Sequence, residues 1–93
     1  MFEALASLTL DESPDRAYRL PPSTRSLLFV FGGQQIGAVA NSTSEFSPGT
    51  SHDEVRLQFW AEAAARALVG AGDHFAVWYG GTVGQGRVHS VSG

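Results

Sequence analysis

The segment Ser51–Val69, SHDEVRLQFWAEAAARALV, constrains the fold of this chain more than any other part of the sequence. Its apolar residues recur at the three- and four-residue spacing of an amphipathic helix, and its polar residues fall on the opposite face. The sequence therefore predicts a helix of about five turns, at roughly 3.6 residues per turn, whose alanine-rich face can pack closely on a sheet. That face would consist of Leu57, Trp60, Ala61, Ala64 and Leu68, widened by Phe59, Ala63 and Ala67.

Signals at both ends of this segment support the helix. Ser51 and Glu54 have the spacing of a capping box, in which each side chain accepts a hydrogen bond from the backbone N–H of the other residue. Glu62 and Arg66 stand in the favourable order for an ion pair along a helix. Gly70 follows as a residue that readily adopts the left-handed conformation common at helix ends. We therefore expect the helix to begin at Ser51 and to end before Gly70.

Residues 26–40 predict a β-hairpin with a glycine turn. The apolar run LLFVF is followed by a second strand of small residues, and the turn between them is either Gly32-Gly33 or Gly33-Gln34. Either turn places alternate residues of both strands on one face, which we expect to receive the helix. This face would hold Leu27, Phe29, Phe31, Ile36, Ala38 and Ala40, and the reverse face Leu28, Val30 and Val39.

A second hairpin is predicted from Phe75–Tyr79 and Arg87–Val91, joined by the glycine loop Gly80–Gly86. Glycine loops bind phosphate where they lead from a strand into a helix. Since this loop joins two strands, we expect a flexible turn. Near the N-terminus, Phe2–Leu10 alternates as a strand does, although a short helix also fits, and Asn41–Thr50 has the composition of a loop.

Together these elements predict an α+β fold in a single domain of 93 residues. An antiparallel sheet of about four or five strands, built from the two hairpins, would carry one central amphipathic helix on one face. Residues 23–93 form this hairpin–helix–hairpin unit. Residues 1–22 are an extended N-terminal segment that prolines interrupt.

Charge and composition exclude several classes of function. The net charge is −3 and the basic residues are scattered arginines, so no basic surface for nucleic acid is expected. There is no cysteine, which excludes disulfides and thiolate zinc sites. No apolar run approaches the length of a membrane span and no secretion signal is recognisable, so we expect a cytoplasmic location and no membrane partner.

The histidines and serines form no recognisable catalytic or metal-binding motif. His52, His74 and His89 lack the close spacing of metal ligands, and His52 is expected on the surface of the first helical turn. No Gly-x-Ser-x-Gly sequence is present. We therefore expect no catalytic residue, cofactor or bound metal, and a protein that is not an enzyme.

The two tryptophans are expected in different environments. Trp60 would pack in the core, because it falls on the apolar face of the predicted helix. Trp78 alternates with Val77 and Tyr79, which places it on the reverse face of the sheet. That face is either covered by the N-terminal segment or exposed as an apolar patch of the kind that marks an interface.

A surplus of apolar residues over what one helix can cover favours a protein-binding module, acting alone or as a homodimer. Small size, acidity and the absence of lysine and cysteine are also typical of proteins by which phages and mobile elements inhibit larger bacterial complexes, anti-CRISPR proteins among them. The alternative is an oligomeric small-molecule-binding or enzymatic subunit with its site near Gly80–Gly86. The residues expected to bind a partner are Trp78, Tyr79, Arg87, His89, Asp11, Glu12 and Asp15, the acidic ones as mimics of nucleic-acid phosphates.

Overall fold

The structure, a computed structural model, describes residues 2–13, 15 and 17–93, and most of them lie in β-strands. In chain order the elements are β1 (Phe2–Leu10), β2 (Ser23–Thr24), β3 (Leu28–Phe31), β4 (Gln34–Asn41), β5 (Ser51–Phe59), α1 (Glu62–Leu68), β6 (His74–Trp78) and β7 (Thr82–Ser92). The strands follow one another across the sheet in the order β2-β4-β3-β6-β7-β1-β5, and neighbouring strands are antiparallel.

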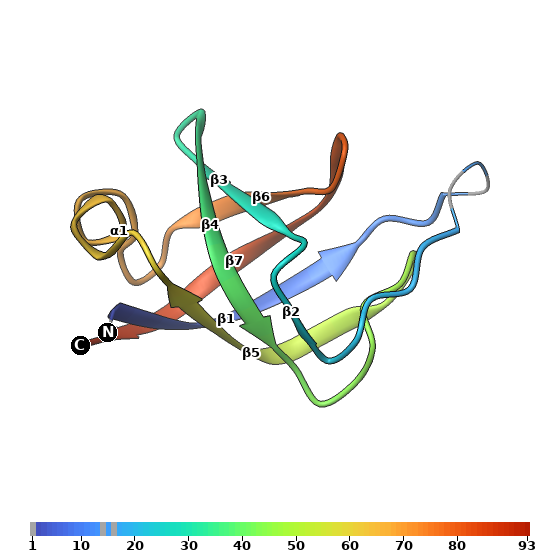
Figure 1. Cartoon of the computed structure of the whole chain (residues 1–93), viewed down its shortest axis with the longest axis horizontal. Helices are drawn as coiled ribbons and strands as arrows, with labels where there is room; N and C mark the ends of the chain where they lie inside the picture. The colour runs from blue at the N-terminus through green and yellow to red at the C-terminus, as the bar shows by residue number, and fades with distance from the viewer. Residues whose placement is uncertain (1, 14, 16) are drawn as a thin grey trace.

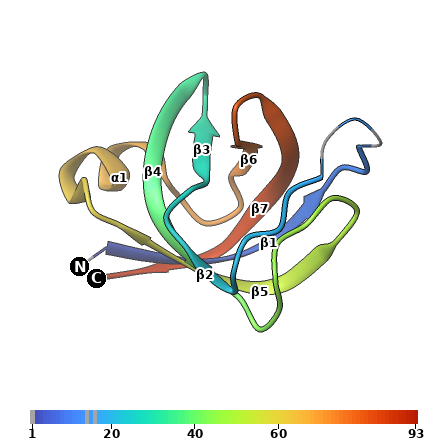
Figure 2. The same ribbon diagram turned by 45° about the vertical axis from the view of Figure 1, so that its right-hand side comes forward.

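The sheet closes on itself to form a barrel. Strand β4 pairs with β5 as well as with β3, with Ala38 opposite Phe59 and Ala40 opposite Leu57. This pairing joins the two ends of a six-stranded sheet, and the short β2 is attached to β4 outside the ring (Figures 1 and 2). The predicted α+β sheet with a central helix is therefore wrong, because a closed barrel covers its apolar face with its own strands and leaves no open face for a helix.

The segment Ser51–Val69 is a strand followed by a short helix. Strand β5 occupies its first half, and only Glu62–Leu68 is helical. Within the strand, Val55, Leu57 and Phe59 alternate with exposed or half-buried residues, and each is at most 1% exposed. The inward residues of this strand are thus spaced by two, as the pleat of a strand requires.

A β-bulge interrupts the two-residue alternation near the start of this strand. Across the pairing of β1 with β5, Ala6 lies opposite Val55 whereas Leu8 lies opposite His52, so two residues of β5 face the single Ser7. The extra residue sets the inward His52 three positions before Val55. The helix was predicted too long because the strand residue Leu57 and the exposed Trp60 happen to continue the three- and four-residue apolar spacing of α1 towards the N-terminus.

The predicted start of the helix at Ser51 is also wrong, whereas its end before Gly70 is confirmed, since α1 ends at Leu68. The Ser51 hydroxyl lies 3.3 Å from that of Thr9 on the neighbouring strand, and no side chain caps α1. Gly70 does not adopt the left-handed conformation. The ion pair between Glu62 and Arg66 is confirmed, with an N–O distance of 2.8 Å.

The first hairpin and the N-terminal strand are confirmed. Phe31 lies opposite Gln34, and the turn residues Gly32 and Gly33 have φ angles of 57° and 85°. Positive φ at both turn positions suits the twist of a two-residue hairpin and favours glycine. Strand β1 covers the whole of Phe2–Leu10, with its alternate residues buried. The predicted inward face of the hairpin is buried too, but it encloses the barrel interior instead of a helix.

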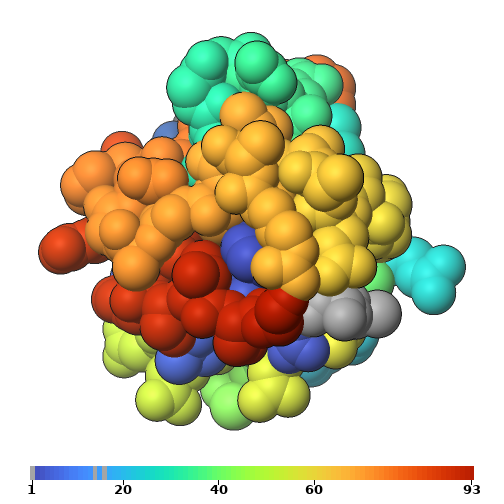
Figure 3. All heavy atoms as spheres, turned by 90° about the vertical axis from the view of Figure 1, so that its left-hand side faces the viewer, coloured from blue at the N-terminus to red at the C-terminus, as the bar shows by residue number. Residues whose placement is uncertain are grey.

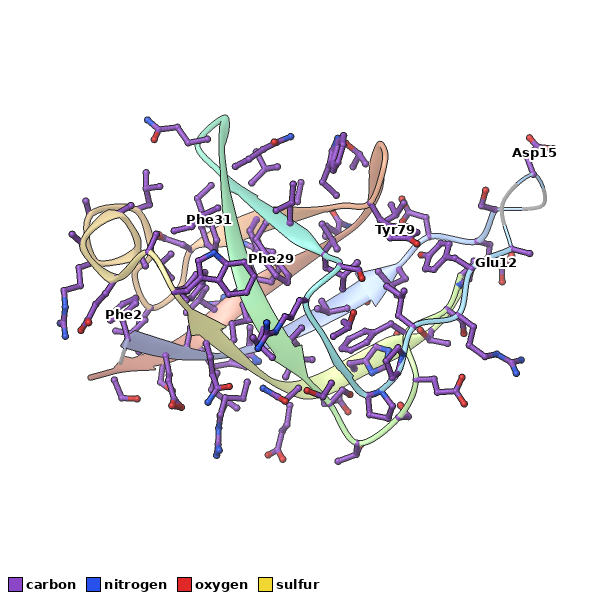
Figure 4. The ribbon with its side chains drawn as sticks, in the orientation of Figure 1. Phe2, Glu12, Asp15, Phe29, Phe31 and Tyr79 are labelled. Carbon is purple, nitrogen blue, oxygen red and sulfur yellow. The ribbon has the colours of Figure 1, made fainter. Side chains whose placement is uncertain are left out.

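Large and small inward side chains fit together inside the barrel. Phe29 and Phe31 point into it (Figure 4). Their rings lie 5.7 Å and 5.2 Å from that of Phe75. Gly86 of β7 makes room for this cluster, since a Cβ atom there would lie 2.4 Å from the Phe75 ring and from the backbone oxygen of Ser7. The predicted flexible loop Gly80–Gly86 is therefore wrong for residues 82–86, which form a strand whose glycines allow close packing.

Different segments close the two ends of the barrel. At one end, α1 and the residues after it lie against the β3–β4 turn and the C-terminus (Figure 3), with Ala65 and Val69 buried. At the other end, Leu20 and Phe46 exchange two backbone hydrogen bonds of 2.8 Å and 2.9 Å and are both buried. Within the described residues no helix is long and apolar enough to cross a membrane.

Candidate functional site

The outward side chains divide the barrel surface into two halves. Strands β3, β4 and β6 belong to residues 26–44 and 75–86, which contain no Asp, Glu, Lys, Arg or His; His74, at the start of β6, is outside these ranges. We call the surface of these three strands the uncharged half, and that of β1, β5 and β7 the charged half. The outward or partly exposed charged residues of the second half are Glu3, Asp53, Glu54, Arg56 and Arg87.

An apolar patch, which we call the tryptophan face, lies on the uncharged half. Gly37 of β4 lies opposite Leu28 of β3, and Leu28 lies opposite Trp78 of β6. Directly opposed residues on one face are close enough for side-chain contact, so this row crosses three strands without a break. The tryptophan face consists of Leu28, Val30, Gly37, Val39, Trp60 and Trp78.

Trp60 is the most exposed member of this face. It follows β5, and 57% of its surface is exposed. Its indole lies against the backbone of β4 at Gly37, where an added Cβ atom would be 2.6 Å from Cζ2 of the ring. The prediction that Trp60 packs in the core is wrong, because the Phe59 side chain points inward at the end of the strand and the next residue therefore points outward.

Two of the residues predicted to bind a partner lie next to each other at one end of β6. Trp78 is half-buried on the outer surface beside Leu28, as predicted. Tyr79 follows it, and its ring lies 5.4 Å from that of Tyr18 and packs against the core. The tryptophan face thus includes Trp78, whereas Tyr79 is held in an aromatic pair.

The basic residues predicted to bind a partner lie in the charged half. Arg87 and His89 are exposed on β7. Arg87 is opposite His74, at the end of β6 away from Trp78. The structure therefore does not bring these basic residues together with Trp78.

The acidic residues predicted to bind a partner lie in the segment after β1. Asp11 donates its backbone N–H to the carbonyl oxygen of Val83 at 2.8 Å, at the end of the barrel where β6 joins β7. Glu12 follows it, and Asp15 projects from the tip of the same loop (Figure 4). These carboxylates are exposed and form no common site with the tryptophan face.

A buried polar cluster surrounds His52, and the expectation of a surface His52 is wrong. The bulge in β5 turns this side chain inward, and it is only 4% exposed. Its Nδ1 lies 2.7 Å from the hydroxyl of Ser42 and 3.4 Å from that of Ser44, and its Nε2 lies 3.0 Å from the hydroxyl of Thr50. The Phe46 ring packs against the imidazole in a tilted arrangement, with 4.6 Å between the ring centroids. Only the bulge and the folding back of the loop join these residues, so no motif in the sequence could reveal them.

The electrostatic environment favours a neutral His52. Burial lowers the pKa of its imidazole below the usual value, and the nearby Asp53 carboxylate partly opposes this shift. The imidazole is therefore uncharged near neutral pH. In the part of the chain that the structure describes, no three His, Cys, Asp or Glu side chains gather closely enough to hold a metal ion.

No protein family model matches this sequence, and no curated protein is similar to it. The fold defines a small closed antiparallel barrel with an exposed aromatic face. Its function is therefore argued from the geometry of the tryptophan face and of the His52 cluster.

Proposed function

We propose that this protein is a protein-binding module whose tryptophan face docks on an uncharged, apolar surface of another protein. One observation carries the proposal: the exposed indole of Trp60 rests on Gly37 within a half of the barrel that lacks charged residues. Tryptophan is among the residues that dominate the binding energy of protein interfaces. A ring supported by a strand backbone loses little conformational freedom when a partner covers it.

The polar residues beside this face match the same kind of partner. Gln35 lies opposite Val30, and Gln58 lies opposite Val39. Their amide groups can donate and accept hydrogen bonds without the desolvation cost of a buried charge. The matching surface is therefore apolar with an uncharged polar rim, since a charged partner would lose hydration here without gaining an ion pair.

Two narrower forms of this function are compatible with the same face. Inhibition of a larger bacterial complex would be one consequence of binding to a component of that complex. A second copy of this chain is the competing occupant, because it presents an identical uncharged face. Oligomeric state and partner capture distinguish the two occupants.

The experiment compares the tagged wild-type chain with Trp60→Ala and with the matched control Val91→Ala. Val91 is 38% exposed but lies on β7 in the charged half. Proteins captured from a bacterial lysate are quantified by mass spectrometry, and the major one is purified and titrated against each variant. We expect binding by the wild type and by Val91→Ala, and at least tenfold weaker binding by Trp60→Ala.

Equal binding by all three chains would contradict the proposal. Light scattering of the isolated chain tests whether a second copy of the chain binds this face. A dimer that Trp60→Ala dissociates and Val91→Ala leaves intact would assign the face to a second copy.

A further inference from the structure

The Ser42 hydroxyl is hydrogen-bonded to an imidazole nitrogen that can only accept. The Thr50 hydroxyl donates its proton to the carbonyl oxygen of Ser47 at 2.7 Å, so towards His52 it acts as an acceptor. In the neutral imidazole, Nε2 therefore carries the proton and donates it to Thr50, and Nδ1 carries the free electron pair. The Ser42 hydroxyl, at 2.7 Å, donates to Nδ1.

This arrangement has the parts of an activated nucleophile. A hydroxyl lies within hydrogen-bond reach of a base, and a third group fixes the tautomer and orientation of that base. Burial and the adjacent Phe46 ring hold the imidazole in place. The backbone N–H of Ser42 donates to the carbonyl oxygen of Pro22 at 2.7 Å, which fixes the backbone of the nucleophile as well.

Ser42 is accessible from outside although His52 is buried. It is half-buried and lines two hollows on the surface, each of about 400 Å³. One hollow is bounded by Thr43, Ser44, Ser51, His52, Asp53 and Glu54, and the other by Leu5, Asn41, Thr43, Glu54, Arg56 and Gln58. The hydroxyl thus stands where two parts of one ligand could lie on either side of it.

Backbone donors are available next to the hydroxyl. The N–H groups of Thr43 and Ser44 make no hydrogen bond with any residue that the structure describes. Free backbone N–H groups beside a nucleophile can stabilise the negative oxygen of a tetrahedral intermediate.

We infer that Ser42 is a nucleophile with His52 as its general base, and that it accepts an acyl group from a neutral or positively charged carboxylic ester. This inference goes beyond the proposed binding function and does not depend on it. The preference for charge follows from the two hollows together, whose linings hold the carboxylates of Asp53 and Glu54 against the single guanidinium of Arg56 and therefore repel an anionic substrate.

The reaction needs only the ester and water. The Ser42 oxygen forms a bond to the carbonyl carbon while its proton moves to Nδ1 of His52, which becomes imidazolium. The carbon–oxygen bond to the alcohol then breaks, and Nδ1 returns the proton to the leaving alkoxide, which departs as the alcohol. Water enters by the same route, with the proton again passing through His52, and releases the acid and the free Ser42 hydroxyl.

The test treats the full chain with a fluorophosphonate probe, which forms a stable bond to activated serines. Intact mass and peptide mapping locate the adduct, and initial rates with neutral and anionic nitrophenyl esters give the substrate preference. We expect a single adduct on Ser42 and at least tenfold faster reaction with the neutral ester. Ser42→Ala should abolish the adduct, whereas the matched control Ser92→Ala, which changes an exposed serine of β7 outside both hollows, should keep it.

His52→Gln tests the general base by the pH dependence of labelling. In the wild type we expect the labelling rate to rise with pH through the pKa of His52, and in the variant to be at least tenfold lower and to lack this rise. If His52→Gln does not fold, the pH dependence of labelling at Ser42 in the wild type tests the role of His52 instead. No adduct on Ser42 of the folded chain, equal labelling of Ser42→Ala, or a profile without the rise would each overturn the inference.

Discussion

The uncharged and charged halves of the barrel surface enclose the same interior but differ in what they present to solvent. In the charged half, Leu5 is 37% exposed and lies between polar residues, opposite Arg56 on one side and Ser90 on the other, while Val91, 38% exposed, lies opposite the small Ala4. On the uncharged half, the Trp60 ring lies over Gly37, which is opposite Leu28, so that these residues form one patch. Single exposed apolar residues are normal on protein surfaces, whereas a contiguous apolar patch marks an interaction site.

This difference teaches that the barrel does not require the tryptophan face. Apart from His52, the inward positions of all six strands are apolar residues or glycine. The burial of these inward residues stabilises the closed barrel. Outward positions tolerate charge in one half without harm to the pairing of strands. The absence of charge from the other half therefore points to function.

The largest expected effect concerns the interior that both halves share. Gly86→Ala places a Cβ atom against the backbone oxygen of Ser7 and the ring of Phe75, neither of which can move freely. We expect the free energy of unfolding to fall by about 3 kcal/mol, as for an overpacked core. Urea unfolding followed by tryptophan fluorescence measures it. A loss below about 1 kcal/mol would show that the interior relaxes more easily than its packing indicates.

The second effect is a dependence of stability on pH that arises from a buried group of the charged half. The uncharged half has no carboxylate, and its one histidine, His74 at the start of β6, is exposed, whereas β5 of the charged half holds the buried His52, whose pKa is lowered from 6.5 by burial. Below that pH the unfolded chain binds more protons than the folded one. The free energy of unfolding is therefore expected to fall as pH decreases below 6.5, by at most about 1.4 kcal/mol per pH unit, and to be constant with respect to this group above it.

Unfolding of the wild type and of His52→Gln at a series of pH values measures this dependence. His74 and His89 are present in both chains, so the difference between the two curves isolates His52. Parallel curves would show that burial of His52 does not couple to stability.

The third effect concerns the contact between Gly37 and Trp60 on the uncharged half. Gly37→Ala adds the same methyl group as Gly86→Ala, but here the obstacle is the exposed ring of Trp60, which can swing away. We expect a stability loss of about 1 kcal/mol or less and weaker partner binding by a similar amount. Calorimetric titration with the captured partner measures the binding. If Gly37→Ala displaces the Trp60 ring but leaves the affinity for the partner unchanged, Trp60 is not part of the interface.

The smallest effect is expected for the ion pair of the charged half. Glu3 and Arg56 lie 3.7 Å apart on neighbouring strands and are both partly exposed. Glu3→Gln should change the free energy of unfolding by about 0.5 kcal/mol or less, because exposed ion pairs contribute little. Urea unfolding at low and high salt measures it. A loss above about 1 kcal/mol would mean that charge on this half supports the barrel and is not merely tolerated.

Local elements were predictable, and their assembly was not. The turn at Gly32-Gly33 and the strand Phe2–Leu10 follow from positive φ and from alternation, which act within a few residues. The helix over Ser51–Val69 was predicted wrongly because its first half is held as a strand by pairing with β1 and β4, which are distant in the sequence. The predicted α+β fold class is wrong for the same reason. Without a long helix to cover its apolar face, the sheet covers that face by closing into a barrel.

The candidate sites show the same limit. Trp78 was predictable on the outer surface because alternation in β6 fixes its direction. Trp60 and the His52 cluster were not, because the direction of each depends on where β5 begins, bulges and ends.

The sequence by itself determined which residues alternate in four of the strands, where the first hairpin turns, and that residues 26–44 and 75–86 carry no charge. Only the tertiary structure decided that the sheet closes through the pairing of β4 with β5, that Trp60 faces solvent over Gly37, and that Ser42 meets His52. The physical reason is range: dihedral preferences and side-chain alternation act between near neighbours in the chain. Strand pairing, a bulge and a buried hydrogen bond join residues that become neighbours only when the barrel is complete.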